Sequence, residues 1–305
     1  MFGTFVRVYK MSKFLIVTAD DFGLHHAVND AVEQASRAGV LTTASLMVAA
    51  PAAADAIRRA RKLPQLRVGL HLVLTDGHAM LPPVLIPALA DAAGRMNNFM
   101  FTDAMRFALL PSVRRQLQAE IRAQFAQFAR TGLALDHVNV HKHFHLHPIV
   151  LEMLLRIGKE FGVRAVRVPN EPLWFAASDG AWLSGVGAAL LTPWVRFMKR
   201  RLRSARVLYN DHIFGVAASG AMDEVRMLQI VRRLPSGVTE IYLHPAAQSG
   251  SIIAASMSQY RHADELAALL SPRVRSAIAS AGVSCGGFAD LVRMRRQTRQ
   301  IELSS

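Results

Sequence analysis

A short stretch of the chain, DHVNVHKHFHLHP over residues 136–148, contains five histidines at odd-numbered positions. They are His137, His141, His143, His145 and His147. Alternate residues of an extended strand point to the same side, and a neutral imidazole is a common metal ligand. At about 3.3 Å per extended residue, His141 and His145 would lie roughly 13 Å apart, too far to share one ion unless the chain curls. We therefore expect one or two of the five to bind metal; the alternative is a histidine-rich surface tract with adventitious affinity.

Other candidate ligands follow apolar runs elsewhere in the sequence. Asp20 and Asp21 end the run in VTADDFG, and because adjacent side chains diverge, one carboxylate can bind metal while the other stays free. His71 follows the apolar run in VGLHLVLTDG, where the alternative is a core histidine that is hydrogen-bonded by a neighbour. One carboxylate and two imidazoles leave coordination positions open for water and substrate. We predict that Asp21, His71 and His141 hold one divalent metal ion, zinc or magnesium.

Apolar, β-branched runs alternate with helical patterns along most of the sequence. The runs predict strands over residues 13–19, 42–48, 66–72, 135–141, 163–169, 207–214, 239–244 and 283–288. Residues 112–132 have an apolar residue at every third or fourth position, which predicts an amphipathic helix. Repeated βα units predict an α/β fold with a parallel sheet, and eight strands suit a single-domain (β/α) barrel, TIM-like and irregular in places.

Polar residues stand at the ends of several predicted strands. They are Asp20, Asp21, His71, His141, Arg167 and His244. In a (β/α) barrel the carboxyl ends of the strands surround one opening, so that residues far apart in the sequence meet there. We therefore expect a single site to contain all six.

Composition bears on the cell compartment and the domain organisation. The chain has 305 residues, of which 51% are hydrophobic, enough for one large core. Its single cysteine, Cys285, excludes a disulfide framework and fits a reducing cytoplasm. Met11 is a second possible start, so we expect residues 1–10 to be an N-terminal extension, 11–292 to form the barrel and 293–305 to be a basic C-terminal tail.

A formal net charge of +14 predicts a polyanionic neighbour, either nucleic acid or an anionic membrane surface. The sequence has no recognisable helix-turn-helix, RNA-binding motif or aromatic stacking pattern, so we expect no specific nucleic acid. Residues 181–206, AWLSGVGAALLTPWVRFMKRRLRSAR, join a tryptophan-containing apolar part to a basic run. The apolar part is shorter than the about 18–20 residues that span a bilayer. We expect the stretch to lie on an anionic membrane surface; the alternative is a barrel helix with a solvated basic end.

Six segments carry a resemblance to a known family. They are FLIVTADDFGLHHAVNDAV, GVLTTASLMV, VGLHLVLTDG, DHVNVHKHFHLHP, VRAVRVPNEP and IYLHPA. In this order and spacing they resemble the YdjC-like carbohydrate deacetylase family, to which chitooligosaccharide deacetylases belong. The resemblance covers about residues 11–292 and implies a (β/α) barrel with a divalent metal on Asp21, His71 and His141. It also implies hydrolysis of the N-acetyl group of an amino sugar, with Asp20 as catalytic base and His244 as acid.

This hydrolysis needs an activated water, a polarised carbonyl group and a proton for the departing amine. A metal ion supplies the first two. A general base such as Asp20 contributes roughly 10² to 10⁴ in rate, and His244 is expected to protonate the departing nitrogen. Arg167 would orient Asp20 or stabilise the oxyanion; the alternative is that it pairs with a structural carboxylate such as Glu171.

The chain departs from the family pattern in places that bear on the substrate. Asn139 and Val140 stand where many relatives have Asp and Ser before the strand-end ligand. The variants TADDFGL and HKHFHLHP resemble the hopanoid-biosynthesis-associated branch of the family. That branch implies removal of acetyl from an N-acetylglucosaminyl hopanoid, with release of acetate, by a cytoplasmic protein that is peripheral on the inner membrane face. The alternatives are a soluble chitooligosaccharide or N-acetylglucosamine deacetylase and, from a different class, a nucleic-acid-binding protein.

Overall fold

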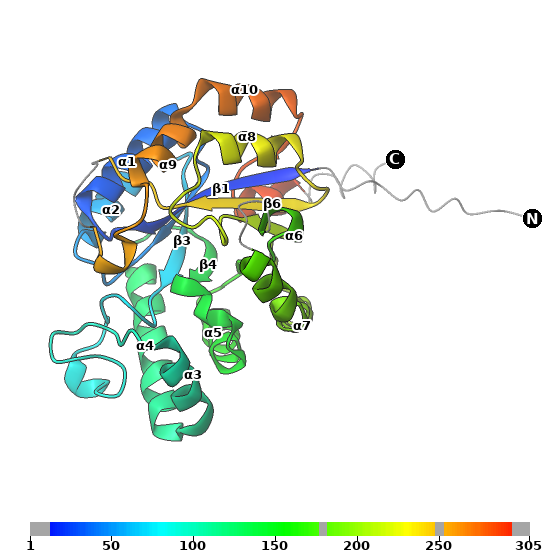
Figure 1. Ribbon diagram of the computed structural model, residues 1–305. Helices are drawn as coiled ribbons and strands as arrows, with labels where there is room; N and C mark the ends of the chain where they lie inside the picture. The colour runs from blue at the N-terminus through cyan, green and yellow to red at the C-terminus, as the bar shows by residue number, and fades with distance from the viewer. Residues whose placement is uncertain (1–12, 177–181, 248–252, 295–305) are drawn as a thin grey trace, which may run out of the picture.

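The structure is a computed structural model that describes residues 13–176, 182–247 and 253–294, with backbone alone for residues 182–190. The predicted N-terminal extension over residues 1–10 and most of the predicted basic tail lie outside the described residues. Within the described part, a curled sheet is surrounded on its outer side by helices (Figure 1).

Seven parallel strands form the sheet in the described chain. They are β1 Phe14–Phe22, β2 Thr43–Leu46, β3 Arg67–Leu72, β4 Leu135–Val140, β5 His212–Phe214, β6 Val238–Leu243 and β7 Ser284–Cys285. Neighbouring strands follow the order β4-β3-β2-β1-β6-β5, and β7 pairs with β1. Along one edge of β1, its first residues pair with β7 and its last residues pair with β2. Along the other edge of β1, residues 14–19 pair with β6. The central strand of the sheet is therefore β1, which also carries the two adjacent aspartates.

The sheet curls into a half-barrel that is not closed. The prediction of an irregular, TIM-like α/β barrel is thus confirmed in fold class, whereas a closed ring of eight strands does not form in the described residues. The segments predicted as strands over 163–169 and 207–214 pair through single bridges and the short β5. Asn210 supplies the physical reason, because its side-chain amide bonds both the N–H and the C=O of Val168. The Asn210 side chain thus makes the hydrogen bonds with Val168 that the backbone of a neighbouring strand would otherwise make.

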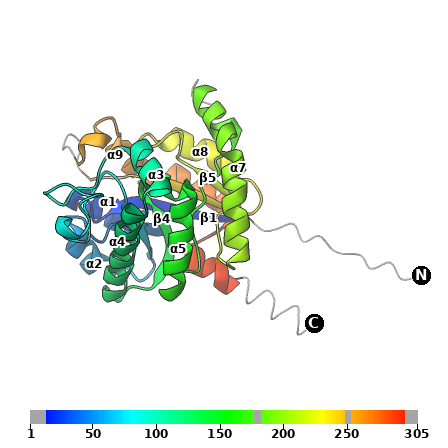
Figure 2. The same ribbon diagram turned by 90° about the horizontal axis from the view of Figure 1, so that it is seen from below.

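The α-helices of the described chain cover the outer side of the sheet (Figures 1 and 2). They are α1 His26–Ala38, α2 Ala53–Ala60, α3 Met100–Leu109, α4 Pro111–Arg130, α5 Pro148–Glu160, α6 Leu173–Ala176, α7 Trp182–Ser204, α8 Glu224–Arg232, α9 His262–Leu270 and α10 Pro272–Ser280. The predicted amphipathic helix over residues 112–132 is α4. Its predicted apolar stripe is buried, which confirms the pattern: Val113, Leu117, Ile121, Phe125 and Phe128.

One face of β1 changes from apolar to acidic along the strand. Phe14 and Ile16 belong to a small apolar cluster at its start. Thr18 follows and donates a hydrogen bond to Glu240 Oε1 at 2.7 Å. Alternate residues of a strand share a face, so Asp20 continues this row. The row therefore closes the amino end of the half-barrel with apolar side chains and leaves a carboxylate at the carboxyl end, where the site lies.

Candidate active site

The two aspartates occupy an irregular end of β1. Asp21 has a left-handed backbone conformation with φ of 61°, and the pairing of β1 with β2 shifts register between Ala19 and Phe22. A non-glycine residue adopts this conformation rarely, at a cost of about 1–3 kcal/mol. The irregularity allows Asp20 and Asp21, both buried, to reach different partners, as the adjacent positions predicted.

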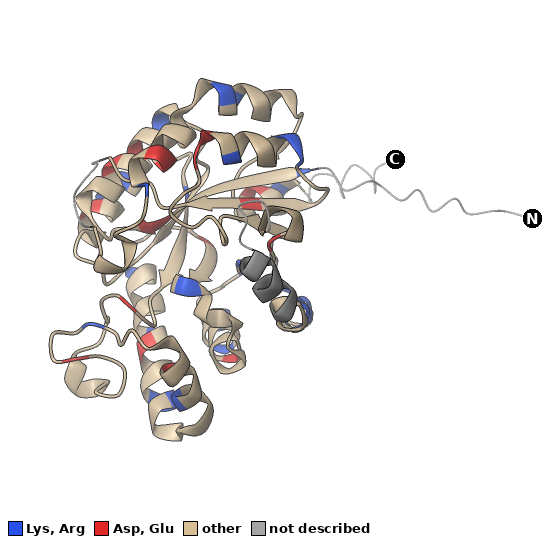
Figure 3. Cartoon of the chain, in the orientation of Figure 1, with Lys and Arg blue, Asp and Glu red and all other residues tan. Residues whose placement is uncertain are grey.

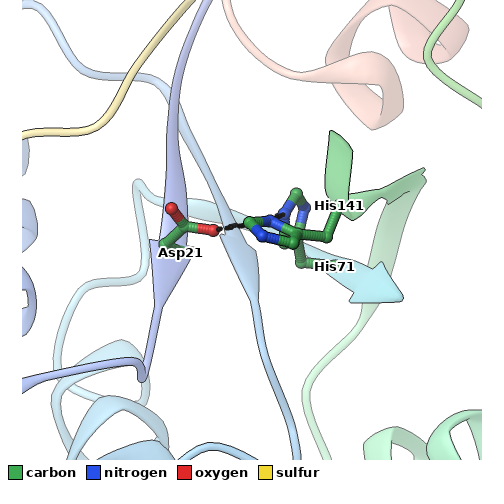
Figure 4. A group of neighbouring side chains, drawn as sticks. All are labelled: Asp21, His71 and His141. Atoms are coloured by element: carbon green, nitrogen blue, oxygen red, sulfur yellow. Dashed lines mark hydrogen bonds and ion pairs between the residues drawn. The ribbon is translucent and has the colours of Figure 1, made fainter. Parts of the chain in front are cut away.

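Asp21, His71 and His141 bring three ligand atoms together (Figure 4). His71 Nε2 lies 3.2 Å from His141 Nδ1 and 3.3 Å from Asp21 Oδ1. His141 Nδ1 lies 3.4 Å from the same oxygen. Ligand atoms about 2.1 Å from a tetrahedral zinc ion lie about 3.4 Å from one another. The three residues predicted as ligands therefore have the mutual spacing of a divalent metal site.

The chemistry of this group also fits a cation. Neither oxygen of the buried Asp21 carboxylate has a hydrogen-bond partner among the described residues. Burial alone would raise the pKa of Asp21, but the imidazoles of His141 and His71 lower it well below its usual range. Burial alone would lower the pKa of His71, but Asp20 and Asp21 raise it. Because a buried carboxylate without donors needs a positive partner, the group fits a divalent metal ion.

Asp20 has its own set of partners. Arg167 donates from Nη1 to Oδ2 and from Nη2 to Oδ1, the latter at 3.0 Å. Asn139 Nδ2 also donates to Oδ1, at 3.0 Å. Burial would raise the pKa of Asp20, whereas Arg167 and, more weakly, His71 hold it below its usual range. The carboxylate of Asp20 is therefore ionised and held in one orientation beside the three ligands.

Arg167 is held from its other side by Glu240. Its Nε and Nη2 donate to Glu240 Oε1 at 3.0 and 2.7 Å, and its guanidinium lies 4.7 Å from the centre of the Tyr242 ring. Glu171 instead accepts hydrogen bonds from three backbone N–H groups of residues 215–217. Glu171 is therefore not the partner of Arg167; the structural carboxylate that pairs with it is Glu240, and the same guanidinium also contacts Asp20.

His244 follows β6 and lies close to the ligand group. Its Nε2 lies 3.9 Å from Asp21 Oδ2. Glu265 accepts the backbone N–H of His244, and His262 Nδ1 contacts its carbonyl oxygen, so the backbone at this position is fixed. Burial lowers the pKa of His244, against the opposing effects of the two aspartates.

A cavity of about 150 Å³ lies beside these side chains. Its lining includes Asp20, His71, His141, His244, Tyr242 and Tyr260. The structure thus brings all six predicted site residues together: five line the cavity or supply ligand atoms, and Arg167 lies behind Asp20.

The chain curls directly after His141, and the later histidines turn to other partners. His143 lies at a positive φ within this turn, and its Nε2 is 3.2 Å from Tyr242 Oη. His145 Nε2 lies 2.8 Å from the carbonyl oxygen of Arg167. Burial lowers the pKa of His145 to about 4 and that of His143 well below its usual range, so both are neutral at pH 7. Within the described residues, His141 alone of the five joins the ligand group.

Sequence reasoning missed three residues of the site. Asn139 contacts both Asp20 and His71; its only signal was a departure from the family pattern. Tyr242 precedes His244 by two residues in the chain, and the shared face of alternate strand residues would have placed both at the cavity. Tyr260 lies in a loop before α9, where no periodic pattern applies.

A second cavity, of about 540 Å³, lies beside α6 and α7. Most of its lining is apolar, including Leu173, Ala176, Leu191, Val195 and Val216. Val216 also lines the first cavity. Nearby, Leu191, Trp194 and Phe197 of α7 are exposed. An apolar surface therefore begins beside the proposed reaction site and continues along α7.

The predicted membrane stretch over residues 181–206 corresponds to α7 and its flanks, with the side chains before residue 191 outside the described part. Arg201 pairs with Glu152, and Lys199 donates to a backbone carbonyl, whereas Arg196 and Arg200 are exposed. In Figure 3 the Lys and Arg positions along the described part of α7 are coloured blue. Among all the residues that the structure describes, no helix is long and apolar enough to cross a bilayer.

The sequence profile of the YdjC-like protein family matches residues 14–280. The chain belongs to this family. A carbohydrate deacetylase of Brevibacillus brevis is 30% identical over 91% of the chain and 99% of its own length. A chitooligosaccharide deacetylase of Serratia marcescens is 28% identical over 92% of the chain and all of its own length. Both relatives thus match this YdjC-like chain over nearly the whole of their own sequences.

A solved structure supports the fold of this YdjC-like protein. A protein of Enterococcus faecalis V583, described as a candidate cellobiose-phosphate cleavage protein, superposes with a TM-score of 0.70 at 24% identity. The superposition covers 92% of the chain and 99% of that protein. The curled sheet and its helices are therefore shared with that protein despite the low sequence identity.

Proposed function

We propose that the chain is a metal-dependent N-deacetylase, a hydrolase that removes acetyl from an N-acetylated amino sugar and releases acetate. The observation that carries this proposal is the group of Asp21, His71 and His141, with Asp20 and His244 lining the same cavity. The full-length relatives named carbohydrate deacetylase and chitooligosaccharide deacetylase support it independently.

In this proposal Asp21, His71 and His141 hold one divalent ion, zinc or magnesium, which when bound polarises the acetyl carbonyl and acidifies water. Asp20, whose carboxylate is ionised and held in one orientation, accepts the proton of the attacking water. His244, which lines the same cavity, donates a proton to the departing nitrogen. The acid and the base are thus two different residues beside the three ligands.

Arg167 serves in this proposal to position Asp20. Four of its N–H groups already donate to Asp20 and Glu240, and the side chain is fully buried. A guanidinium so occupied has little capacity to bind an oxyanion as well. The orienting role is therefore favoured over the oxyanion role.

For the substrate, we propose an N-acetylglucosaminyl lipid, and specifically a hopanoid, presented at an anionic membrane surface. The apolar cavity that shares Val216 with the reaction cavity supports this choice, because a sugar in one cavity would place an apolar aglycone beside the other. The exposed Trp194 and Phe197 of α7 suit the headgroup layer, and Arg196 and Arg200 suit anionic lipid. The protein would then be peripheral on the inner membrane face.

The alternative is a soluble chitooligosaccharide or N-acetylglucosamine deacetylase, which the name of the Serratia marcescens relative supports. Incubation of metal-loaded protein with N-acetylglucosaminyl hopanoid and with N,N'-diacetylchitobiose, in parallel, separates the two readings. We expect acetate from the lipid in vesicles at a higher kcat/KM. Preference for the disaccharide would select the soluble alternative, and acetate from neither substrate would contradict deacetylation of both.

A further inference from the structure

Asn139, on β4, lies between the proposed base and a proposed metal ligand. It is fully buried and pairs in register with His71 on β3. Its Oδ1 lies 2.8 Å from His71 Nδ1, and its Nδ2 donates to Asp20 Oδ1 at 3.0 Å. One amide group therefore contacts the base and the ligand at the same time.

The two ends of this amide dictate where the protons lie. Asn139 Oδ1 can only accept, so His71 Nδ1 carries the hydrogen between them. His71 Nε2, which faces Asp21 and His141, is then left with its lone pair, as a metal ligand requires. Rotating the amide by 180° would set its oxygen against the Asp20 carboxylate, so that only one orientation is compatible with both partners.

A buried relay holds the amide in this orientation. Asn139 Nδ2 also donates to Ser45 Oγ at 3.1 Å, and Ser45 Oγ lies 3.0 Å from His137 Nε2. His137 Nδ1 lies 3.0 Å from Asp136 Oδ2, and the Asp136 carboxylate also accepts two backbone N–H groups. With a carboxylate at its end, the relay has one direction: His137 donates to Asp136, Ser45 to His137, and Asn139 to Ser45.

The Ser45, His137 and Asp136 side chains have the order of a nucleophilic triad, but their surroundings exclude that role. Ser45 is fully buried, and it is not among the residues that line the reaction cavity. A nucleophile must meet its substrate. The relay therefore acts on Asn139 rather than on a reacting carbonyl.

Gly69 on β3 reserves the space for this relay. It is the register partner of Ser45, and a Cβ at this position would lie 2.5 Å from atoms of the His137 ring. Real side chains do not approach one another so closely, so any other residue would displace the imidazole. The backbone of β3 thus accommodates the relay, in addition to carrying His71.

We propose that Asn139 is a positioning residue for the deacetylation, and that Ser45, His137 and Asp136 fix its orientation. Asn139 sets the ligand tautomer of His71 and the orientation of Asp20 together, and thereby couples metal binding to the placement of the base. The inference rests on the proposed function for its effect on turnover; its effect on metal binding does not require turnover.

The first test compares two buried asparagines. Asn139→Ala removes both contacts, and Asn210→Ala is the matched control because Asn210 is equally buried but bonds only backbone groups. We expect the affinity for Zn²⁺, measured by competition with a chromogenic chelator, to fall about 10- to 100-fold in Asn139→Ala and to change little in Asn210→Ala. Unchanged Zn²⁺ affinity in Asn139→Ala would overturn the proposal.

A spectroscopic signature tests the contact with His71 directly. In NMR spectra of the Zn²⁺-loaded protein, we expect the His71 Nδ1–H proton to exchange slowly with solvent and to exchange rapidly in Asn139→Ala. The same slow exchange in both proteins would contradict the contact. If Asn139→Ala does not fold, Ser45→Ala replaces it, because this change removes only the hydroxyl next to Asn139. We expect Ser45→Ala to lower the Zn²⁺ affinity and to speed the exchange of the His71 Nδ1–H proton, both by less than in Asn139→Ala. If neither quantity changes, the proposal is overturned.

Asn139→Asp separates the two halves of the role. A carboxylate at this position can accept from His71, but beside the Asp20 carboxylate it must either repel it or share a proton with it, and both impair the base. Zn²⁺ affinity should therefore return to the wild-type level while kcat stays at least about tenfold low at similar KM. Full recovery of kcat, or no recovery of affinity, would overturn the coupling. Wild-type protein that binds Zn²⁺ but releases no acetate would contradict the proposed function alone, because the affinity and exchange tests do not use turnover.

Discussion

The surroundings of Asp21 and the surface along α7 are built in opposite ways. Beside Asp21, ligand atoms on three strand ends lie 3.2–3.4 Å apart, and buried hydrogen bonds fix their neighbours. Along α7, Leu191, Trp194 and Phe197 are 41%, 46% and 38% exposed, and the rings of Trp194 and Phe197 pack edge to face. The first region is held by buried directional contacts, whereas the second is an apolar surface open to solvent.

This difference indicates a division of labour within the site. Catalysis of amide hydrolysis depends on groups held in the productive geometry in advance, because misplacement by about 1 Å can cost 10²-fold in rate. Recognition of an apolar aglycone depends mainly on buried area, which is not directional. Changes near Asp21 should therefore affect the reaction with every substrate, and changes on α7 should affect some substrates more than others.

The largest expected effect comes from removing a metal ligand. His71→Ala takes one of three donors from the group, so we expect loss of stoichiometric divalent-metal binding and no detectable acetate release, with the fold retained. Elemental analysis of the purified protein measures the occupancy. His147→Ala, in the same histidine-rich stretch but half-buried, is the control and should keep its metal. Full occupancy in His71→Ala would show that the ligand assignment is wrong.

The next largest effect separates the base from the metal. In Asp20→Asn the amide cannot accept a proton from water, so we expect kcat to fall about 10²- to 10⁴-fold while the metal content stays the same. Steady-state acetate release and elemental analysis on the same sample measure both quantities. Turnover close to wild type would exclude Asp20 as the base.

His244→Ala should slow amide cleavage by about 10²-fold, because the amine then leaves without a positioned proton donor. An acetyl ester with a good leaving group does not need that proton, so its hydrolysis should be largely restored in His244→Ala but not in Asp20→Asn. Rates on the amide and on the ester, for both variants, measure the difference. Equal restoration in both would contradict the separate roles of acid and base.

The smallest effect is expected on the exposed surface along α7, and it tests whether this surface differs in role from the surroundings of Asp21. Each exposed cation contributes about 1 kcal/mol at most to binding an anionic membrane, so neutralising Arg196 and Arg200 together should weaken vesicle binding by up to about 30-fold at low salt. Activity on vesicle-embedded lipid should fall, and activity on a soluble N-acetylglucosaminide should not. Vesicle flotation and acetate release measure the two effects.

A matched pair on another helix controls for net charge. Arg115 and Arg130 of α4 are also exposed, and their neutralisation should leave flotation unchanged. Equal flotation of the α7 variant and wild type would remove the membrane from the proposal and favour the soluble substrate. A uniform loss on both substrates would instead indicate damage to the fold.

The sequence predicted the parts of the molecule that depend on periodicity. Strand ends of a parallel sheet converge, which was enough to bring Asp21, His71 and His141 to one place. Alternation failed where the chain leaves the strand, at the left-handed turn after His141, and where the Asn210 side chain replaces a backbone pair. These features depend on contacts between segments distant in the sequence, which periodicity does not encode.

The relay behind the site shows the same limit. Asn139 and Ser45 contact each other only because β2, β3 and β4 pair in one particular register. A shift by one residue would send every side chain of a strand to the other face. The metal ligands can be predicted with less information, because a residue type and a position at the end of a strand are enough to suggest them.

The most direct test of the central claim is a metal titration of the chelator-treated protein, with acetate release measured at each step on the preferred substrate. If Asp21, His71 and His141 hold the ion on which deacetylation depends, activity rises from zero and saturates at one equivalent of divalent metal per chain, and His71→Ala stays inactive throughout. Full activity of the metal-free protein, or saturation of His71→Ala at the same one equivalent, would contradict it.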